Sequence, residues 1–360
     1  MTDGGPSARV GMPLAGRVDR QAVCNSILLF RGTSEMPIRN SMAAMAWAAS
    51  VLLAPAMAKA DTWPSRPITL ICPFGAGGAP DIIARFVAKE LTEKLGQNVV
   101  VENRTGASGN IGAGAVAKSA PDGYTLLLGT PSPIVINKML EGNNQTFDPD
   151  TELTPIIVIG GSASVMVTSP KASSRTVQEL IAAAKAKPNS MNAGVPGLGT
   201  SSHLAMELFM RLTGTQFTIV PYRGTPPLGD VLSGQIDVAI TPTIAYISLI
   251  NDGQLHPLAV TSPERSGLAP NVPTLDEMGL KGYEATTWYV IMAATGTPSA
   301  IVDRINGIIS EYLKSESGQK MLKQFDVAAV GGTPRAAKDY LVGEVGKWRP
   351  IVKAANFKMQ

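Results

Sequence analysis

The chain alternates between short apolar runs and longer segments in which apolar residues recur every three to four positions. Residues 68–73 form the first such run, which predicts a buried strand. The segment after it places apolar residues on one helical face, namely Ile82, Ile83, Phe86, Val87, Leu91 and Leu95. Gly96 predicts the end of this helix, because glycine adopts the left-handed conformation that closes many helices.

The same alternation continues along the chain. Further strands are predicted at 98–102, 124–128, 156–159, 164–168, 191–194, 218–220, 237–240, 258–261 and 286–293. Further helices are predicted at 109–118, 177–187, 203–213, 226–232 and in most of the chain beyond residue 299. Strands that alternate with helices indicate an α/β protein built on a parallel sheet.

The N-terminal part has a different pattern. Arg31 and Arg39 precede an apolar, Ala-rich run at 42–57, and Ala58-Lys59-Ala60 supplies the small residues that a signal peptidase requires. The apolar run is shorter than the roughly 20 residues that span a bilayer, which disfavours a membrane anchor. No cysteine at the cleavage region is available for a lipid.

These features predict a signal peptide at 36–60 and a mature chain that starts at Asp61 in the periplasm of a Gram-negative bacterium. Residues 1–35 show no periodicity, and since Met36 and Met42 can each serve as a start, we expect an over-extended N-terminus.

The net positive charge of the chain lies in residues 1–60, the leader that precedes the expected mature protein. The formal net charge is +3, but residues 1–60 hold six basic and three acidic residues, which leaves 25 of each sign in the remainder. A neutral mature surface argues against nucleic acid or an anionic membrane as a partner. Of the two cysteines only Cys72 follows the leader, so stability must come from burial of apolar side chains.

Four connections that run from a strand to a helix are rich in Gly, Ser, Thr and Pro: 74–80, 129–133, 195–202 and 222–227. Each places backbone amides at a helix start, where they and the helix dipole favour an anion. In open α/β sheets ligands bind beyond the carboxyl ends of the strands, so the four loops predict a carboxylate site. Turns and helix caps require the same residue types, which is the alternative for any single loop.

Enzyme and cofactor motifs are missing from the sequence. Pro80 stands where a dinucleotide fingerprint needs its third glycine, and there is no phosphate loop or nucleophile elbow. No cluster of Cys or His has metal-ligand spacing. We therefore expect no cofactor, no metal and no catalytic residue.

Several side chains near the loops are candidates for ligand contact. His203 opens a helix and either contacts the ligand or bonds to its neighbours, whereas His256 is expected to be structural. Asp81 either recognises a cationic group or complements the helix dipole. Tyr222 and Arg223 follow a strand and are placed to project into the cleft, and the alternative for Arg223 is a surface salt bridge.

Ordered blocks from Trp63 to about Phe357 resemble a known family, the extracytoplasmic solute receptors of tripartite tricarboxylate transporters, or Bug proteins. The blocks include PFGAGGAPD (73–81), VENRTGASGNIGA (101–113), APDGYTLLLGT (120–130), GLGTSSHL (197–204), VPYRG (220–224), LAVTSPERS (258–266) and Lys347-Trp348. Departures from the family pattern are Thr105, Gly114 and Thr241, and the last is a position at which ligand choice can change.

The resemblance implies a type II periplasmic binding-protein fold, in which two α/β domains joined by two crossover segments enclose a ligand and close by a hinge motion. It places domain 1 at 61–162 plus 284–360 and domain 2 at 163–283, with crossovers near 160–163 and 282–285. The implied ligand contacts, together with the loop candidates, are Phe74, Gly75, Ala76, Gly77, Gly78, Asp81, Thr130, Ser132, Thr200, Ser201, His203, Tyr222, Arg223 and Thr241.

The leading hypothesis is a monomeric binding protein that captures a small organic carboxylate and delivers it to the membrane subunits of a tripartite tricarboxylate transporter. Dicarboxylates, tricarboxylates, acidic amino acids and aromatic acids all remain open, and Asp81 is expected to bind the ammonium group of an amino acid. Two alternatives are a periplasmic enzyme that uses His203 as its base and a ligand sensor that serves a signalling receptor.

Overall fold

The computed structural model describes residues 63–140, 145–222 and 227–355. The expected signal peptide, the expected N-terminal extension and Arg223 lie outside the described residues. Residues 61–360 form one compact unit, built on two β-sheets.

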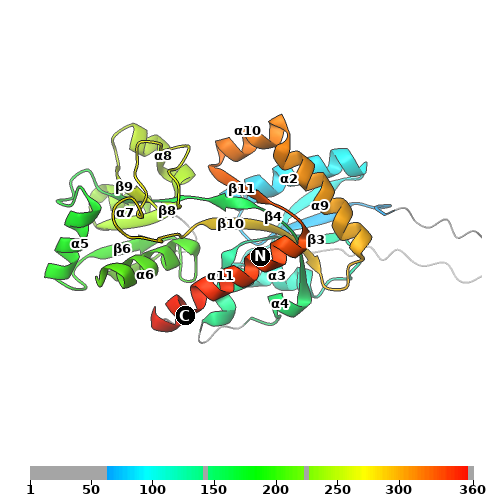
Figure 1. Ribbon diagram of the computed structural model, residues 1–360, viewed down its shortest axis with the longest axis horizontal. Coiled ribbons are helices and arrows are strands. Elements are labelled where there is room, and N and C mark those ends of the chain that lie inside the picture. Colours follow the sequence, from blue (N-terminus) through cyan, green and yellow to red (C-terminus); the bar gives the residue numbers. More distant parts are fainter. Residues whose placement is uncertain (1–62, 141–144, 223–226, 356–360) are drawn as a thin grey trace, which may run out of the picture. The chain divides into compact units, whose positions relative to one another are not determined.

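The first sheet has six strands in the order β11-β4-β10-β3-β1-β2 (Figure 1). Their bounds are β1 Ile68–Cys72, β2 Val99–Asn103, β3 Thr125–Gly129, β4 Leu153–Ser162, β10 Thr287–Ala294 and β11 Val327–Gly331. The second sheet has five strands in the order β7-β6-β8-β5-β9. Their bounds are β5 Ser164–Thr168, β6 Asn192–Val195, β7 Thr218–Pro221, β8 Val238–Pro242 and β9 His256–Val260.

Helices connect most of these strands. Their bounds are α2 Ala79–Leu95, α3 Asn110–Ala117, α4 Pro149–Glu152, α5 Val177–Ala186, α6 Ser201–Thr213, α7 Leu228–Ser233, α8 Thr243–Asn251, α9 Ser299–Lys314, α10 Glu316–Gln324 and α11 Pro334–Ala355. Three short irregular helical turns are η1 Ala107–Gly109, η2 Ser132–Ile136 and η3 Asn137–Met139. Gly96 ends α2 with φ 70°, as the sequence predicts.

Both faces of the first sheet are covered by helices. Ile68, Leu70 and Cys72 pack into one apolar cluster with side chains of α2 and α9, whereas Ile71 packs into a second cluster with side chains of α3 and α11. Figure 1 accordingly shows α2, α9 and α10 on one side of this sheet and α3 and α11 on the other. Burial on both faces explains why the strands read as continuous apolar runs and not as alternating ones.

The expectation of parallel sheets is wrong in part, because both sheets are mixed. The first residues of β10 pair with the last residues of β4, Thr287 with Ser162, so β10 runs antiparallel to β4 and also to β3. In the second sheet β5 runs antiparallel to β8 and β9. The physical reason is that the chain reaches both β5 and β10 from the other sheet, β5 after one residue and β10 after residues 261–286, at the edge where the parallel strands end.

The chain changes sheet twice. Ala163 alone separates β4 of the first sheet from β5 of the second, and residues 261–286 lead from β9 back to β10. These changes support the proposed domain limits at 162/163 and 283/284, which remain a prediction.

Some elements differ from the sequence-based expectation. β4 is longer than the expected 156–159, and both α8 and β11 were missed. The α8 segment TIAYISLIN is apolar without a clear helical period, and β11, VAAVG, consists mainly of small residues. Neither gives the periodic pattern on which the prediction relies.

A buried carboxylate fixes α11 against the strand β10. Oε2 of Glu344 accepts hydrogen bonds from the indole N–H groups of Trp288, at 2.8 Å, and Trp348, at 2.9 Å. Its other oxygen, Oε1, pairs with Lys347 at 2.5 Å, and Lys347 also lies 3.6 Å from Glu284. This arrangement ties the C-terminal helix to the start of β10. Within the described residues, no helix has the length and apolarity needed to cross a bilayer.

Candidate functional site

A cavity of about 470 Å³ lies where strand-to-helix connections of both sheets meet. It is lined by Phe74, Gly77, Gly78, Ala79, Pro80, Ile82, Thr130, Ser132, Pro196, Thr200, Ser201, Ser202, Pro242, Ile244, Ala245, Thr287, Tyr289 and Phe325. These residues follow β1 and β3 of the first sheet and β6 and β8 of the second, with additions from β10 and α10. The expected position beyond the carboxyl ends of the strands is therefore the position of this cavity.

The glycine loop after β1 is held by Asp81. Oδ2 of Asp81 accepts hydrogen bonds from the Gly77 N–H at 2.9 Å and from Nε of Arg85 at 3.0 Å. Oδ1 accepts from Nη2 of Arg85 at 3.0 Å and from Nδ2 of Asn103 at 2.9 Å. Asn103 also donates to the Phe74 carbonyl at 2.9 Å, so one network joins the two ends of the loop.

The Asp81 side chain is consequently occupied within the protein. It is 2% exposed and does not line the cavity. Burial by itself raises the pKa of Asp81, but hydrogen bonds from Arg85, the Gly77 N–H and Asn103 outweigh it and leave the pKa below its usual value. These contacts give no support to the expected ammonium contact, and they identify Asp81 as the residue that shapes the glycine loop.

The connection after β3 contributes two hydroxyl groups with different surroundings. Thr130 is 3% exposed, and its Oγ1 has no hydrogen-bond partner within the part of the chain that the structure describes. Ser132 is also buried, but its hydroxyl donates to the Gly199 carbonyl at 3.0 Å. Ser132 therefore links the connection after β3 to the one after β6, whereas Thr130 lines the cavity and keeps a buried hydroxyl without a described partner.

The start of α6 forms the wall supplied by the second sheet. Thr200 caps this helix by accepting from the His203 N–H at 3.3 Å, and its hydroxyl donates to the Gly197 carbonyl at 2.8 Å. Ser201 and Ser202 occupy the first helical turn and line the cavity. α2 and α6 both begin at this cavity, so the positive ends of two helix dipoles lie there. Pro80 has no N–H and the His203 N–H bonds to Thr200, which leaves Ala79, Ser201 and Ser202 as the lining residues whose first-turn amides have no intrahelical acceptor.

His203 lies behind this wall. It is 1% exposed and absent from the cavity lining. Its Nδ1 accepts from the Gly199 N–H at 3.1 Å, and Nε2 lies 3.4 Å from Oε1 of Glu207. His203 thus fixes the loop before α6, which is the alternative that the sequence left open.

The remaining candidates lie outside the lining. Tyr222 is half-buried and donates its hydroxyl to Asp230, and burial, followed by this contact, raises the pKa of Tyr222 to about 12. Thr241 is fully buried in β8, where it pairs with Val165, and its Oγ1 has no hydrogen-bond partner in the described ranges. Gly75 and Ala76 belong to the glycine loop but do not line the cavity.

Sequence reasoning missed several lining residues. Pro242 ends β8, and Ile244 and Ala245 lie in the first turn of α8, which follows β8 without an intervening loop that the sequence could reveal. Phe325 follows α10, and Thr287 and Tyr289 belong to β10, which returns to the first sheet from far along the chain. For these residues only the strand order reveals their place at the site.

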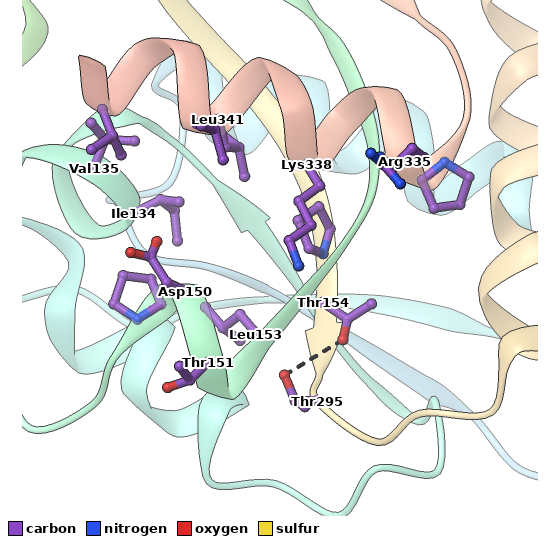
Figure 2. A pocket seen from close by; sticks show the side chains of 15 residues that line it. Ile134, Val135, Asp150, Thr151, Leu153, Thr154, Thr295, Arg335, Lys338 and Leu341 are labelled. Atoms are coloured by element: carbon purple, nitrogen blue, oxygen red, sulfur yellow. Dashed lines mark hydrogen bonds between the residues drawn. The ribbon is translucent and has the colours of Figure 1, made fainter. Parts of the chain in front are cut away.

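A second cavity, of about 640 Å³, lies between α11 and the segment formed by η2, α4 and β4 (Figure 2). Figure 2 shows Lys338 and Leu341 of α11 facing this space, with Thr154 hydrogen-bonded to Thr295 at 3.5 Å. None of the expected site residues lines it. In neither cavity, nor elsewhere among the described residues, do three or more Cys, His, Asp or Glu side chains gather as metal ligands would.

Comparison with known proteins identifies the family. The model of the tripartite tricarboxylate transporter family receptor matches residues 83–357. The chain belongs to this receptor family. Protein BugT of Bordetella pertussis, a curated relative, is 36% identical over 303 residues, which are 84% of this chain and 93% of BugT.

Solved structures of the receptor family have the same fold. One from R. palustris, determined with adipate, is 37% identical, has a TM-score of 0.75 and covers 81% of this chain and 98% of its own. MatC from Rhodopseudomonas palustris with bound malate is 26% identical, has a TM-score of 0.72 and covers 81% of this chain and all of MatC. The two sheets and these relatives confirm the two-domain type II fold. The family consists of solute-binding receptors and not of enzymes, so the alternative of a periplasmic enzyme is rejected.

Proposed function

We propose that this receptor captures a small organic carboxylate in the periplasm and delivers it to the membrane subunits of a tripartite tricarboxylate transporter. It works as a monomer, and the carboxylate binds in the 470 Å³ cavity. The observation that carries the proposal is the convergence of two helix starts, α2 and α6, with the buried hydroxyl of Thr130, which has no partner among the described residues.

The chemistry of that convergence suits a carboxylate. Free amides of the first helical turns donate hydrogen bonds, and each helix dipole favours an anion by about 0.3–1 kcal/mol, or more when partly buried. The Thr130 hydroxyl adds a further donor in a low-dielectric setting, where a hydrogen bond to an anion is stronger than in water. Related receptors with adipate and malate bound support this ligand class.

The residues proposed to contact the ligand are the predicted contacts that line the cavity, namely Phe74, Gly77, Gly78, Thr130, Ser132, Thr200 and Ser201. Asp81 and His203 act by holding the loops in position, and Gly75 and Ala76 stay predictions. Tyr222 and Thr241 stay predictions, because neither lines the cavity, and so does Arg223, which lies outside the described residues.

The test compares two identical substitutions. Thr130→Val removes a buried hydroxyl at the cavity, and Thr168→Val removes one in β5 that is equally buried and likewise has no partner within the described chain. Neither change breaks a described hydrogen bond, so both variants should match or exceed the wild type in stability. Only Thr130→Val should weaken binding of a carboxylate, by about 1.5–3 kcal/mol if the lost bond is charged.

Binding is measured by thermal shift and by calorimetry against a panel of carboxylates and their neutral amides. A ligand that binds only the folded state raises stability by about 2.7 kcal/mol at a hundredfold excess over Kd. Equal affinity in the two variants would remove Thr130 from the site. Stabilisation by the amides as well as the acids would contradict the carboxylate assignment.

A further inference from the structure

We propose that Asn137 is a positioning residue for ligand capture. It holds the turn 106–109 in a strained conformation, and this turn binds the loop 197–199 when the receptor closes around its ligand. The turn follows β2 of the first sheet, and the loop follows β6 of the second. Together they form a latch that slows release of the ligand. This role rests on the proposed function, because it concerns how long a captured carboxylate stays bound.

The turn and the loop meet far from the two crossovers that join the sheets. β4 and β10, which carry the chain to and from the second sheet, stand next to each other in the first sheet, whereas β2 is the edge strand beyond β3 and β1. In the second sheet β5 and β9 receive the crossovers at one end, and β6 lies toward the other end, beside the edge strand β7. A hinge motion about the crossovers moves the parts farthest from them most, so the contact between turn and loop must break when the receptor opens.

The turn has a backbone conformation that side chains rarely allow. All four of its residues have a positive φ, which is 126° at Gly106, 46° at Ala107, 51° at Ser108 and 95° at Gly109. Glycine adopts such angles readily, but the Cβ atoms of alanine and serine make them unfavourable. Residues other than glycine keep this conformation only where surrounding contacts enforce it, and they concentrate at ligand clamps and switch regions. The turn therefore needs a residue that holds it.

Asn137 provides that contact. Its side chain is 0% exposed, and its Nδ2 donates to the Ser108 carbonyl at 3.3 Å and to Oδ1 of Asn110 at 2.7 Å. It thus fixes both the turn and the first residue of α3. Its Oδ1 is buried and has no hydrogen-bond partner among the described residues. Protein interiors rarely leave such an atom unpaired, which indicates a role beyond stability.

The loop 197–199 lies directly against this group. The Ser108 hydroxyl donates to the Leu198 carbonyl at 3.4 Å, and the Ser132 hydroxyl donates to the Gly199 carbonyl at 3.0 Å. A Cβ added to Gly199 would lie only 3.3 Å from Oδ1 of Asn137, and Gly199 has φ 71°. Glycine is therefore required here both by the backbone conformation and by the close approach of the loop to Asn137.

The latch adjoins both walls of the ligand cavity without contributing to the lining. A Cβ added to Gly109 would lie 3.4 Å from the ring of Phe74, which lines the cavity. Thr200 follows the loop, caps α6 and also lines the cavity. Ser108 and Asn137 do not line it. Asn137 therefore acts on the ligand through the turn and the loop, by opposing the motion that lets the ligand leave.

The experiment compares three variants of the full chain, Asn137→Ala, Ser108→Ala and Asn306→Ala, with the wild type. Asn306 is the matched control: its Nδ2 also donates twice, to the Ile156 carbonyl at 2.9 Å and the Gly332 carbonyl at 2.8 Å, but it belongs to α9 and bonds to neither turn nor loop. The probes are butanedioate, hexanedioate, 2-hydroxybutanedioate and 3-phenylpropanoate. Calorimetry measures Kd, stopped-flow competition measures the dissociation rate of the probe, and urea unfolding measures stability.

Asn137→Ala should release a bound probe at least about tenfold faster than the wild type, and Ser108→Ala at least about threefold faster, because each lost neutral hydrogen bond is worth roughly a factor of 2 to 12. Since Asn137 acts through the turn, the double variant should stay within about twofold of Asn137→Ala alone. Asn306→Ala should lose stability but release the probe within about twofold of the wild-type rate.

An unchanged dissociation rate in a folded Asn137→Ala protein overturns the inference while carboxylate capture stands. Equal acceleration by Asn306→Ala also overturns it, because general destabilisation then explains the effect. If Asn137→Ala does not fold, Ser108→Ala decides, and release at the wild-type rate contradicts the latch. Failure of all four probes to bind the wild type overturns the proposed function and the inference with it.

Discussion

The buried Glu344 offers the sharpest test of what holds the C-terminal helix in place. One of its oxygens, Oε2, accepts from both indole N–H groups, those of Trp288 and Trp348, which are 0% and 1% exposed. Glu344→Ala removes this acceptor and leaves two buried donors without it. Glu344→Gln keeps an oxygen of the same geometry and gives up only the charge that faces Lys347.

The two variants should differ widely in stability. A buried donor deprived of its acceptor costs about 1–3 kcal/mol, so Glu344→Ala should lower the free energy of unfolding by about 2–6 kcal/mol. That is a large share of the roughly 5–15 kcal/mol typical of folded proteins. Glu344→Gln should cost less than Glu344→Ala, because it keeps an acceptor for both indole N–H groups, and Lys347, whose pair with Glu344 is lost, still lies 3.6 Å from Glu284.

Urea unfolding followed by tryptophan fluorescence and by circular dichroism measures these differences, and coincidence of the two transitions tests two-state behaviour. Trp288→Phe serves as a control that removes one donor and leaves the acceptor in place. If Glu344→Gln were as damaging as Glu344→Ala, the ion pair and not the indole bonds would be the stabilising contact. If neither variant lost more than 1 kcal/mol, the reasoning would be refuted.

Two further predictions concern the first strand and its loop. Asp81→Asn should cost about 1–3 kcal/mol, since it weakens the contacts to Arg85 and the Gly77 N–H. Because the folded-state pKa of Asp81 is lowered, its stabilisation is present above the unfolded value of about 3.9 and is lost as pH falls through the folded value. Urea midpoints between about pH 5 and pH 2 should therefore fall more steeply for the wild type than for Asp81→Asn, and parallel curves would contradict the role of the carboxylate. Burial raises the pKa of Cys72 to about 11, so in a Cys24→Ser chain a thiol reagent at pH 8 should label no cysteine until urea unfolds the protein. Rapid labelling under native conditions would show that the first sheet opens locally.

The sequence predicts local structure well where apolar periodicity is strong. The strand at 68–72, the helix that ends at Gly96 and the helix before Gly214 all form close to their expected limits. The sequence predicted parallel sheets, but β10 and β5 run antiparallel to β3 and β8. Strand direction depends on how the chain passes between the two sheets, and no local sequence pattern contains that information.

The site was only partly predictable for a related reason. Residues after β1, β3 and β6 were found from their Gly, Ser and Thr content, which reflects the turns and caps that they form. Asp81 and His203 were predicted as ligand contacts; in the structure their side chains lie outside the cavity lining and bond to the backbone of Gly77 and Gly199, which no sequence pattern reveals. Ile244 and Phe325 lie at the cavity only because the strand order brings them there.

The central position of β10 has a consequence for how the protein is made. The second sheet draws all its strands from Ser164 to Val260, so its pairing partners are complete well before the chain ends. The first sheet requires Thr287–Ala294 between β3 and β4, and until those residues emerge both strands expose open hydrogen-bonding edges. Even after β1 has paired with β2 and β3, the facing edges of β3 and β4 therefore lack their partner until residue 287 and beyond are made, so a product truncated before residue 287 should be prone to aggregation and proteolysis.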